Sequence, residues 1–180
     1  MLSLKTKQIV YSGLLIACSV LLPQLFHLVG GPGLGTTLLP MHIPVLIAGF
    51  ILGPIPGLMI GIVSPICSFL YTGGTMPAIP MLYLMIAELG TYGLFTGLVF
   101  KKFKVNVYVS LIISMISGRV ARGLIFVVAT KFLGIVLPPA MGISIAITQG
   151  IPGIILQLLI IPPIIYLLCK LPYTKSLMTE

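Results

Sequence analysis

The residues that could do chemistry in this sequence are a few polar side chains that interrupt long apolar runs. They are His42, Glu88, Arg119, Arg122, Gln149 and Gln157. Charged groups within apolar spans are costly, and they mark a candidate functional site by default. Arg119 and Arg122 are three residues apart, so both face the same side of a helix.

Glu88 and Arg122 lie at nearly the same depth from the corresponding ends of their apolar runs, taking a helical rise of about 1.5 Å per residue. One acid against two guanidinium groups leaves a surplus positive charge, which predicts an anionic ligand such as a carboxylate or phosphate. Two structural alternatives stay open. Glu88 could form an ion pair that fixes helix packing, or Arg122 could snorkel toward the interface.

The other polar residues could also have structural roles in place of ligand binding. His42 could hydrogen-bond a helix end or contact a ligand, and Gln149 and Gln157 could bond between helices. Tyr92 could pack in the bundle or stack on a ligand ring. We place His42, Glu88, Tyr92, Arg119, Arg122 and Gln149 in one candidate substrate-binding group.

Most enzymatic chemistry is excluded by what the sequence lacks. Its only acids are Glu88 and Glu180, so hydrolytic carboxylate pairs and hard-metal sites are not expected. There is no phosphate-binding loop and no zinc-protease motif. The net charge of +8 comes with no basic face for nucleic acid. We therefore expect no enzyme, no metal and no cofactor.

The elements that must position these residues are transmembrane helices. Apolar residues make up 58% of the 180 residues and charged residues 7%. The charged fraction of a soluble domain is much higher, roughly a quarter. We predict an all-α bundle, one domain over residues 1–180, with six spans at about 8–29, 38–52, 58–71, 80–100, 105–128 and 143–169. The second and third are expected to be short or broken.

Glycine and proline punctuate this pattern. Loops are predicted at 30–35 and 72–77, and a tight turn at 53–57. Pro162 and Pro163 predict a kink in the last helix. Gly49, Gly53, Gly57 and Gly61 recur every four residues, which indicates close helix packing or a hinge.

The lysines set the predicted orientation. With six spans, one side of the membrane receives Lys5, Lys7, Lys101, Lys102, Lys104, Lys170 and Lys175, and the other receives Lys131. The positive-inside rule then places both termini in the cytoplasm. Five spans would divide these clusters between the two sides.

Two segments of the chain resemble a known family. The run 39–54, followed by Gly57, Gly61, Pro65 and 72–74, is similar to substrate-binding S components of energy-coupling factor (ECF) transporters, and so is 88–93. The resemblance implies a subunit that captures a vitamin or similar micronutrient at the outer face of a prokaryotic-type plasma membrane. A transmembrane coupling subunit and two cytoplasmic ATPases would then topple it to deliver the ligand inward.

The resemblance also implies roles for loops and for the first helix. Outer loops would close over the ligand, with Gly31, Gly33, Gly35, Gly73, Gly74 and Pro138 as gating residues. Family members often carry alanines four apart on the first helix for docking to the coupling subunit, where this chain has Gly13 and Ala17.

The leading hypothesis is thus a capture subunit for a small anion, with a pantothenate-like carboxylate as one guess. A neutral substrate, such as a pyridoxine-like or queuosine-precursor compound, stays open. A structural or assembly membrane protein is one alternative class. A stand-alone carrier that uses Glu88 as its proton site is another.

Overall fold

The computed structural model of the chain describes residues 4–132, 134–135, 138, 142–171 and 177, and this part is helical throughout apart from short connections. Its elements are α1 Leu4–Leu38, α2 His42–Leu52, α3 Pro54–Tyr71, α4 Met81–Gly97, the π-helical turn η1 Leu98–Lys102, α5 Val107–Val127, the π-helical turn η2 Val128–Phe132 and α6 Ile143–Lys170. Within the described ranges, five helices are long and apolar enough to cross a membrane, and α2 is shorter. The prediction of an all-α membrane bundle is confirmed.

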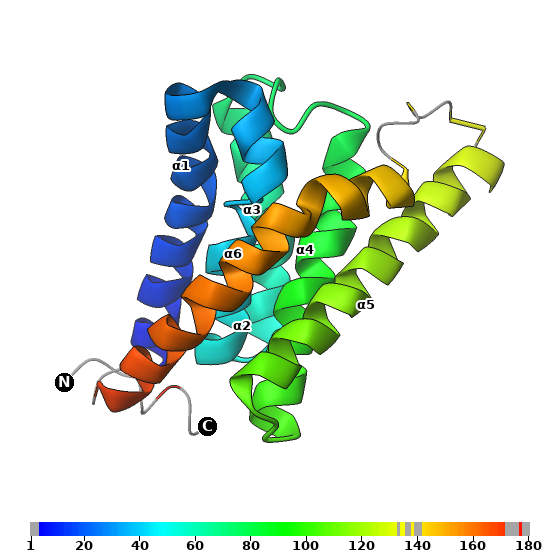
Figure 1. The fold of residues 1–180 in the computed structure, drawn as a ribbon. Coiled ribbons are helices and arrows are strands. Elements are labelled where there is room, and N and C mark those ends of the chain that lie inside the picture. Colours follow the sequence, from blue (N-terminus) through cyan, green and yellow to red (C-terminus); the bar gives the residue numbers. More distant parts are fainter. Residues whose placement is uncertain (1–3, 133, 136–137, 139–141, 172–176, 178–180) are drawn as a thin grey trace.

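Both termini and the α4–α5 connection lie at one end of the bundle, which we call the terminal end (Figure 1). The opposite end, called the far end, carries the bend in α1 and the α3–α4 connection. The predicted number of six crossings stays a prediction, since five of the described helices are long enough to span a membrane. The direction in which the bundle sits in a membrane remains a prediction.

The predicted loop at 30–35 is wrong, because α1 stays helical to Leu38 on both sides of a single break at Gly31. Gly31 has φ +73° and ψ −177°, a backbone conformation that residues with a side chain rarely adopt. After this break the chain turns and runs back toward the terminal end (Figure 1). The second segment that runs along the bundle is therefore a broken helix, made of the last turns of α1 and the 11 residues of α2.

The third helix is not short, which corrects the second half of that prediction. Pro54 is the first residue of α3, so the expected turn at 53–57 is largely the first turn of an 18-residue helix. Proline suits this position, since its fixed φ fits a helix and its missing N–H would have no helical partner there. In α6, the helix continues through Pro152, Pro162 and Pro163.

Glycines bring the central helices into backbone contact. A methyl group on Gly57 would lie 2.5 Å from the carbonyl oxygen of Gly93, and one on Gly49 would lie 2.6 Å from the same oxygen. Gly97 packs in the same way against the backbone of Gly53 and Pro54. The close packing predicted from the four-residue glycine spacing is confirmed, and it holds α2 and α3 tightly on α4.

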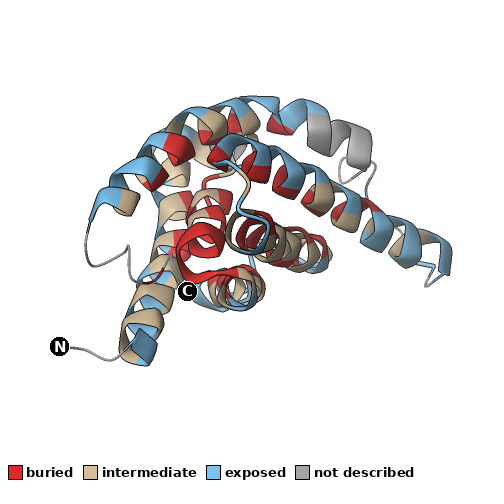
Figure 2. Ribbon diagram, turned by 90° about the horizontal axis from the view of Figure 1, so that it is seen from below, coloured by how far each residue is buried: buried red, intermediate tan, exposed pale blue. Residues whose placement is uncertain are grey.

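The short helix α2 forms the centre of the bundle. Nearly all of its residues are buried, including Val45, Leu46 and Phe50, which are fully buried. Seen along the bundle, buried residues lie on the helix sides that face one another, and exposed residues lie on the outer sides (Figure 2). The exposed side chains are largely apolar, as expected of a surface that faces lipid.

We expect Gly93→Ala to lower the stability of the bundle by about 1–3 kcal/mol, because the added methyl group meets rigid backbone of α3. Thermal unfolding of the purified protein in detergent measures this. Gly13→Ala is the matched control, since a methyl group there meets nothing within 4 Å. An equal melting temperature for Gly93→Ala and the wild type would contradict the close contact.

Candidate functional site

A fully buried carboxylate, that of Glu88 in α4, binds two guanidinium groups of α5. Arg119 Nη1 lies 2.8 Å from Glu88 Oε1, and Arg122 Nη1 donates to Glu88 Oε2 at 2.9 Å. The three-residue spacing places both arginines on the face of α5 that packs on α4, as predicted. The snorkelling alternative for Arg122 is wrong, because this side chain turns into the bundle and is 7% exposed.

Tyr92 and His42 complete the surroundings of this carboxylate. The Tyr92 hydroxyl donates to Glu88 Oε1 at 3.1 Å, and His42 Nε2 lies 3.7 Å from the same oxygen. The rings of His42 and Tyr92 are 5.2 Å apart between centroids. Gly118 of α5 makes room for this arrangement, since a methyl group there would overlap the Tyr92 ring.

Glu88 can neutralise only one of its two arginines. Among the described residues, Arg119 Nε and Nη2, Arg122 Nε and both ring nitrogens of His42 are buried without a hydrogen-bond partner. Buried polar groups are normally hydrogen-bonded, so unsatisfied donors need an explanation. A surplus cation with spare N–H donors is the pattern that an anionic ligand would satisfy.

A cavity of about 270 Å³ lies directly beside these groups, near the far end of the bundle. Its polar lining consists of His27, His42, Ser68, Thr75, Arg119, Arg122 and Gln149. Its apolar lining is rich in methionine and proline: Pro23, Pro40, Met41, Met76, Pro77, Met81 and Met85. We call this space the polar cavity.

The structure thus brings four predicted site residues to one cavity, namely His42, Arg119, Arg122 and Gln149. Glu88 and Tyr92 are not part of the lining: Glu88 binds the two arginines from the side away from the cavity, and Tyr92 donates to Glu88. Gln149 is exposed, while Gln157 is buried and its Nε2 has no hydrogen-bond partner in the described part of the chain.

Sequence reasoning missed His27 of α1. Its Nδ1 lies 3.3 Å from the carbonyl oxygen of Gly31, and its ring fills the space in which a side chain on Gly35 would sit. His27 also lines the polar cavity. The signal was available, because His27 is a polar residue within the first predicted span.

The predicted gating residues fall in three structural settings. Gly31 is the break in α1, and Gly33 and Gly35 are helical, so these three do not form a loop. Gly73 and Gly74 do lie in the α3–α4 connection, with φ of +62° and +86°. Pro138 is exposed.

The α3–α4 connection is tied to the end of α3. Thr72 Oγ1 accepts from the Met76 backbone N–H at 3.0 Å, and Ser68 Oγ donates to the Met76 carbonyl at 3.1 Å. These bonds hold Thr75, Met76 and Pro77 where they line the polar cavity.

The predicted docking residues lie on the first helix. Gly13 and Ala17 are both exposed on α1, four residues apart. A side chain at Gly13 would meet nothing within 4 Å. The docking role of Gly13 and Ala17 stays a prediction.

Five long apolar helices are typical of a multi-pass membrane protein, and a cavity of about 270 Å³ lies among the helices. A model of the family "ECF transporter, substrate-specific component" matches residues 7–165, and the chain belongs to this family. It is therefore the substrate-binding membrane subunit of an ECF transporter in the plasma membrane, and members of this family associate with an ECF module. No curated protein and no solved structure gives a match.

We expect Glu88→Gln to destabilise the protein strongly, by about 3–5 kcal/mol, because it leaves two buried guanidinium groups without a counter-charge. Thermal unfolding in detergent measures the loss. The double variant Glu88→Gln/Arg119→Gln should recover part of it, since one buried cation is removed as well. A single variant as stable as the wild type would show that Glu88 does not hold the arginines.

Proposed function

We propose that this subunit captures a small, vitamin-like anion in the polar cavity, with a carboxylate of the pantothenate type as the working example. The observation that carries the proposal is the surplus arginine: two guanidinium groups line the cavity, and one carboxylate stands behind them. A ligand carboxylate would neutralise the remaining charge and accept hydrogen bonds from the unsatisfied donors.

Burial strengthens this attraction. Arg122 is 5% exposed, and the side chain of Arg119 is 11% exposed. Charges in such surroundings interact more strongly than charges in water, because the local dielectric constant is low. The Glu88 contacts also fix the guanidinium groups in advance, which reduces the ordering cost of binding. His27 and His42 can add hydrogen bonds to the ligand.

Capture would take place from outside the cell. The lysine distribution predicts that the terminal end is cytoplasmic, so the far end with its cavity would face outward. The α3–α4 connection would act as one gate, because Gly73 and Gly74 can adopt backbone conformations with positive φ that other residues rarely adopt. Gly31 would supply a second bending point, with Gly33 and Gly35 carried on the segment beyond it, and Pro138 would belong to a third gate.

Delivery to the cytoplasm would depend on partners. The sequence has no nucleotide-binding motif, so a coupling subunit and two ATPases would supply the energy. The exposed Gly13 and Ala17 would let the coupling subunit approach α1 closely, and toppling of the whole subunit would carry the ligand inward.

A purely structural role for the charged cluster is the second candidate, favoured by the complete pairing of Glu88 within the bundle. That role gives no reason for the cavity beside the arginines or for their unsatisfied donors. Native mass spectrometry of the gently purified protein distinguishes the two, since only the capture subunit retains a small anion.

We expect Arg122→Gln to weaken binding of pantothenate by roughly 10- to 100-fold, the loss of a charge-assisted hydrogen bond. The variant should remain folded, because Glu88 keeps Arg119 as its partner. Equilibrium dialysis with labelled ligand measures the affinity, and Lys131→Gln is the control, since Lys131 is exposed and outside the cavity lining. Binding that survives replacement of both Arg119 and Arg122 would refute the proposal.

A further inference from the structure

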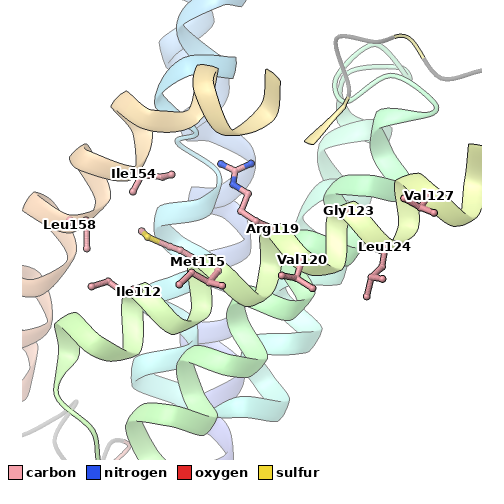
Figure 3. Close-up of a pocket in the computed structure, with 10 residues that line it drawn as sticks. Ile112, Met115, Arg119, Val120, Gly123, Leu124, Val127, Ile154 and Leu158 are labelled. Carbon is pink, nitrogen blue, oxygen red and sulfur yellow. The ribbon is translucent and has the colours of Figure 1, made fainter. Parts of the chain in front are cut away.

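A second hollow lies between α5 and α6, with a volume of about 670 Å³ (Figure 3). Its walls are apolar, with Ile112, Val120, Leu124 and Val127 on α5 and Ile154 and Leu158 on α6. We call it the apolar groove. Arg119 is the single charged residue among the described residues of this lining.

Arg119 belongs to both hollows. Its Nη1 is directed to Glu88, while a methyl group on Gly150 of α6 would lie only 2.6 Å from its Nη2. The guanidinium group therefore bridges from α5 to α6, and Figure 3 shows the side chain rising into the space between these helices. The absence of a side chain at Gly150 leaves room for this position.

We propose that the substrate is an amphipathic monocarboxylate, with its carboxylate on Arg119 and Arg122 and its apolar chain extending past Arg119 into the groove. This inference rests on the proposed function and specifies the substrate class. A ligand head bound at Arg119 stands at the boundary of both spaces, and the other described residues that line the groove are apolar.

The walls of the polar cavity favour the same class of ligand. Met41, Met76, Met81 and Met85 contribute thioether side chains, which adapt their shape to an apolar partner. Ser68, Thr75 and Gln149 are the polar, uncharged side chains of the lining among the described residues. A heavily hydroxylated ligand would leave many of its groups without a hydrogen-bond partner, at a cost for each.

The charge at Arg119 distinguishes this occupant from a lipid tail. The groove is open along α5, where Val120 and Leu124 are 56% and 62% exposed. A bilayer chain could cover these side chains from that side. An acyl chain alone, however, would do nothing for the buried Nε and Nη2 of Arg119, whereas a carboxylate joined to the chain satisfies them.

The test is a chain-length series measured on the protein in nanodiscs. Binding of labelled butanoate, hexanoate and octanoate is determined by equilibrium dialysis, with pantothenate as the polar-bodied carboxylate. Empty nanodiscs and the matching primary alcohols correct for partition into lipid. We expect affinity to rise by roughly fourfold for each methylene group buried in the groove, and the alcohols to bind without this gain.

Val120→Phe narrows the groove and should abolish the gain in affinity from butanoate to octanoate. Leu124→Phe is a second variant on the same wall. Ile113→Phe is the matched control, because Ile113 is exposed on α5 and lines neither hollow. It should retain the full dependence on chain length.

Three results would decide against the inference. If short carboxylates and pantothenate bind through the arginines with no dependence on chain length, the inference fails and the proposed function stands. If no carboxylate binds, the proposed function fails with it. If alcohols gain as much per methylene group as carboxylates, or a phospholipid co-purifies and blocks octanoate, the groove is a lipid site and the inference is overturned.

Discussion

The structure depends on one constraint: the Glu88 carboxylate must be buried together with two guanidinium groups. An unpaired charge inside a membrane bundle is expensive, so α4 and α5 have to approach closely enough for Arg119 and Arg122 to reach Glu88. Gly118 permits this approach on one side of the carboxylate. On the other side, α2 brings His42 to the same oxygen that binds Tyr92. The position of the cavity follows from this meeting point.

The rigid part of the molecule surrounds Glu88, and the more open parts line the two hollows. Glycine contacts fix α2 and α3 on α4 through backbone atoms, which leaves little freedom around Glu88. The parts that line the hollows are held less tightly. The helix α1 bends at Gly31, and the α3–α4 connection is hydrogen-bonded to Ser68 and Thr72. An apolar groove lies between α5 and α6. A capture subunit needs this combination, since a fixed binding group retains its geometry while the surrounding segments admit the ligand.

Charge and depth made the site predictable, whereas the glycine-rich and proline-rich segments misled. His42, Arg119, Arg122 and Gln149 were grouped from their polarity, from the spacing of the arginines and from depth, because burial of charge leaves few arrangements. Glycines at 30–35 predicted a loop by the rules of soluble proteins, but backbone groups in a membrane must be bonded within the chain, so only Gly31 departs from helix. Pro54 was read as a turn although it can begin a helix. The groove could not be found in the sequence, because it depends on how far α5 and α6 diverge.

The cluster of Glu88, Arg119 and Arg122 is hard to explain by its contribution to stability alone. A buried ion pair often contributes no more than apolar residues of equal volume, although removal of one partner is costly. Two arginines on one carboxylate stabilise the fold even less. The second guanidinium group is attracted to Glu88, but its burial leaves the cluster with an unbalanced positive charge. A cluster that served packing would be improved by replacing the second arginine with an apolar residue. The proposed function gives the surplus charge a use, since an anion would neutralise it and Arg119 and Arg122 line the cavity in which that anion would bind.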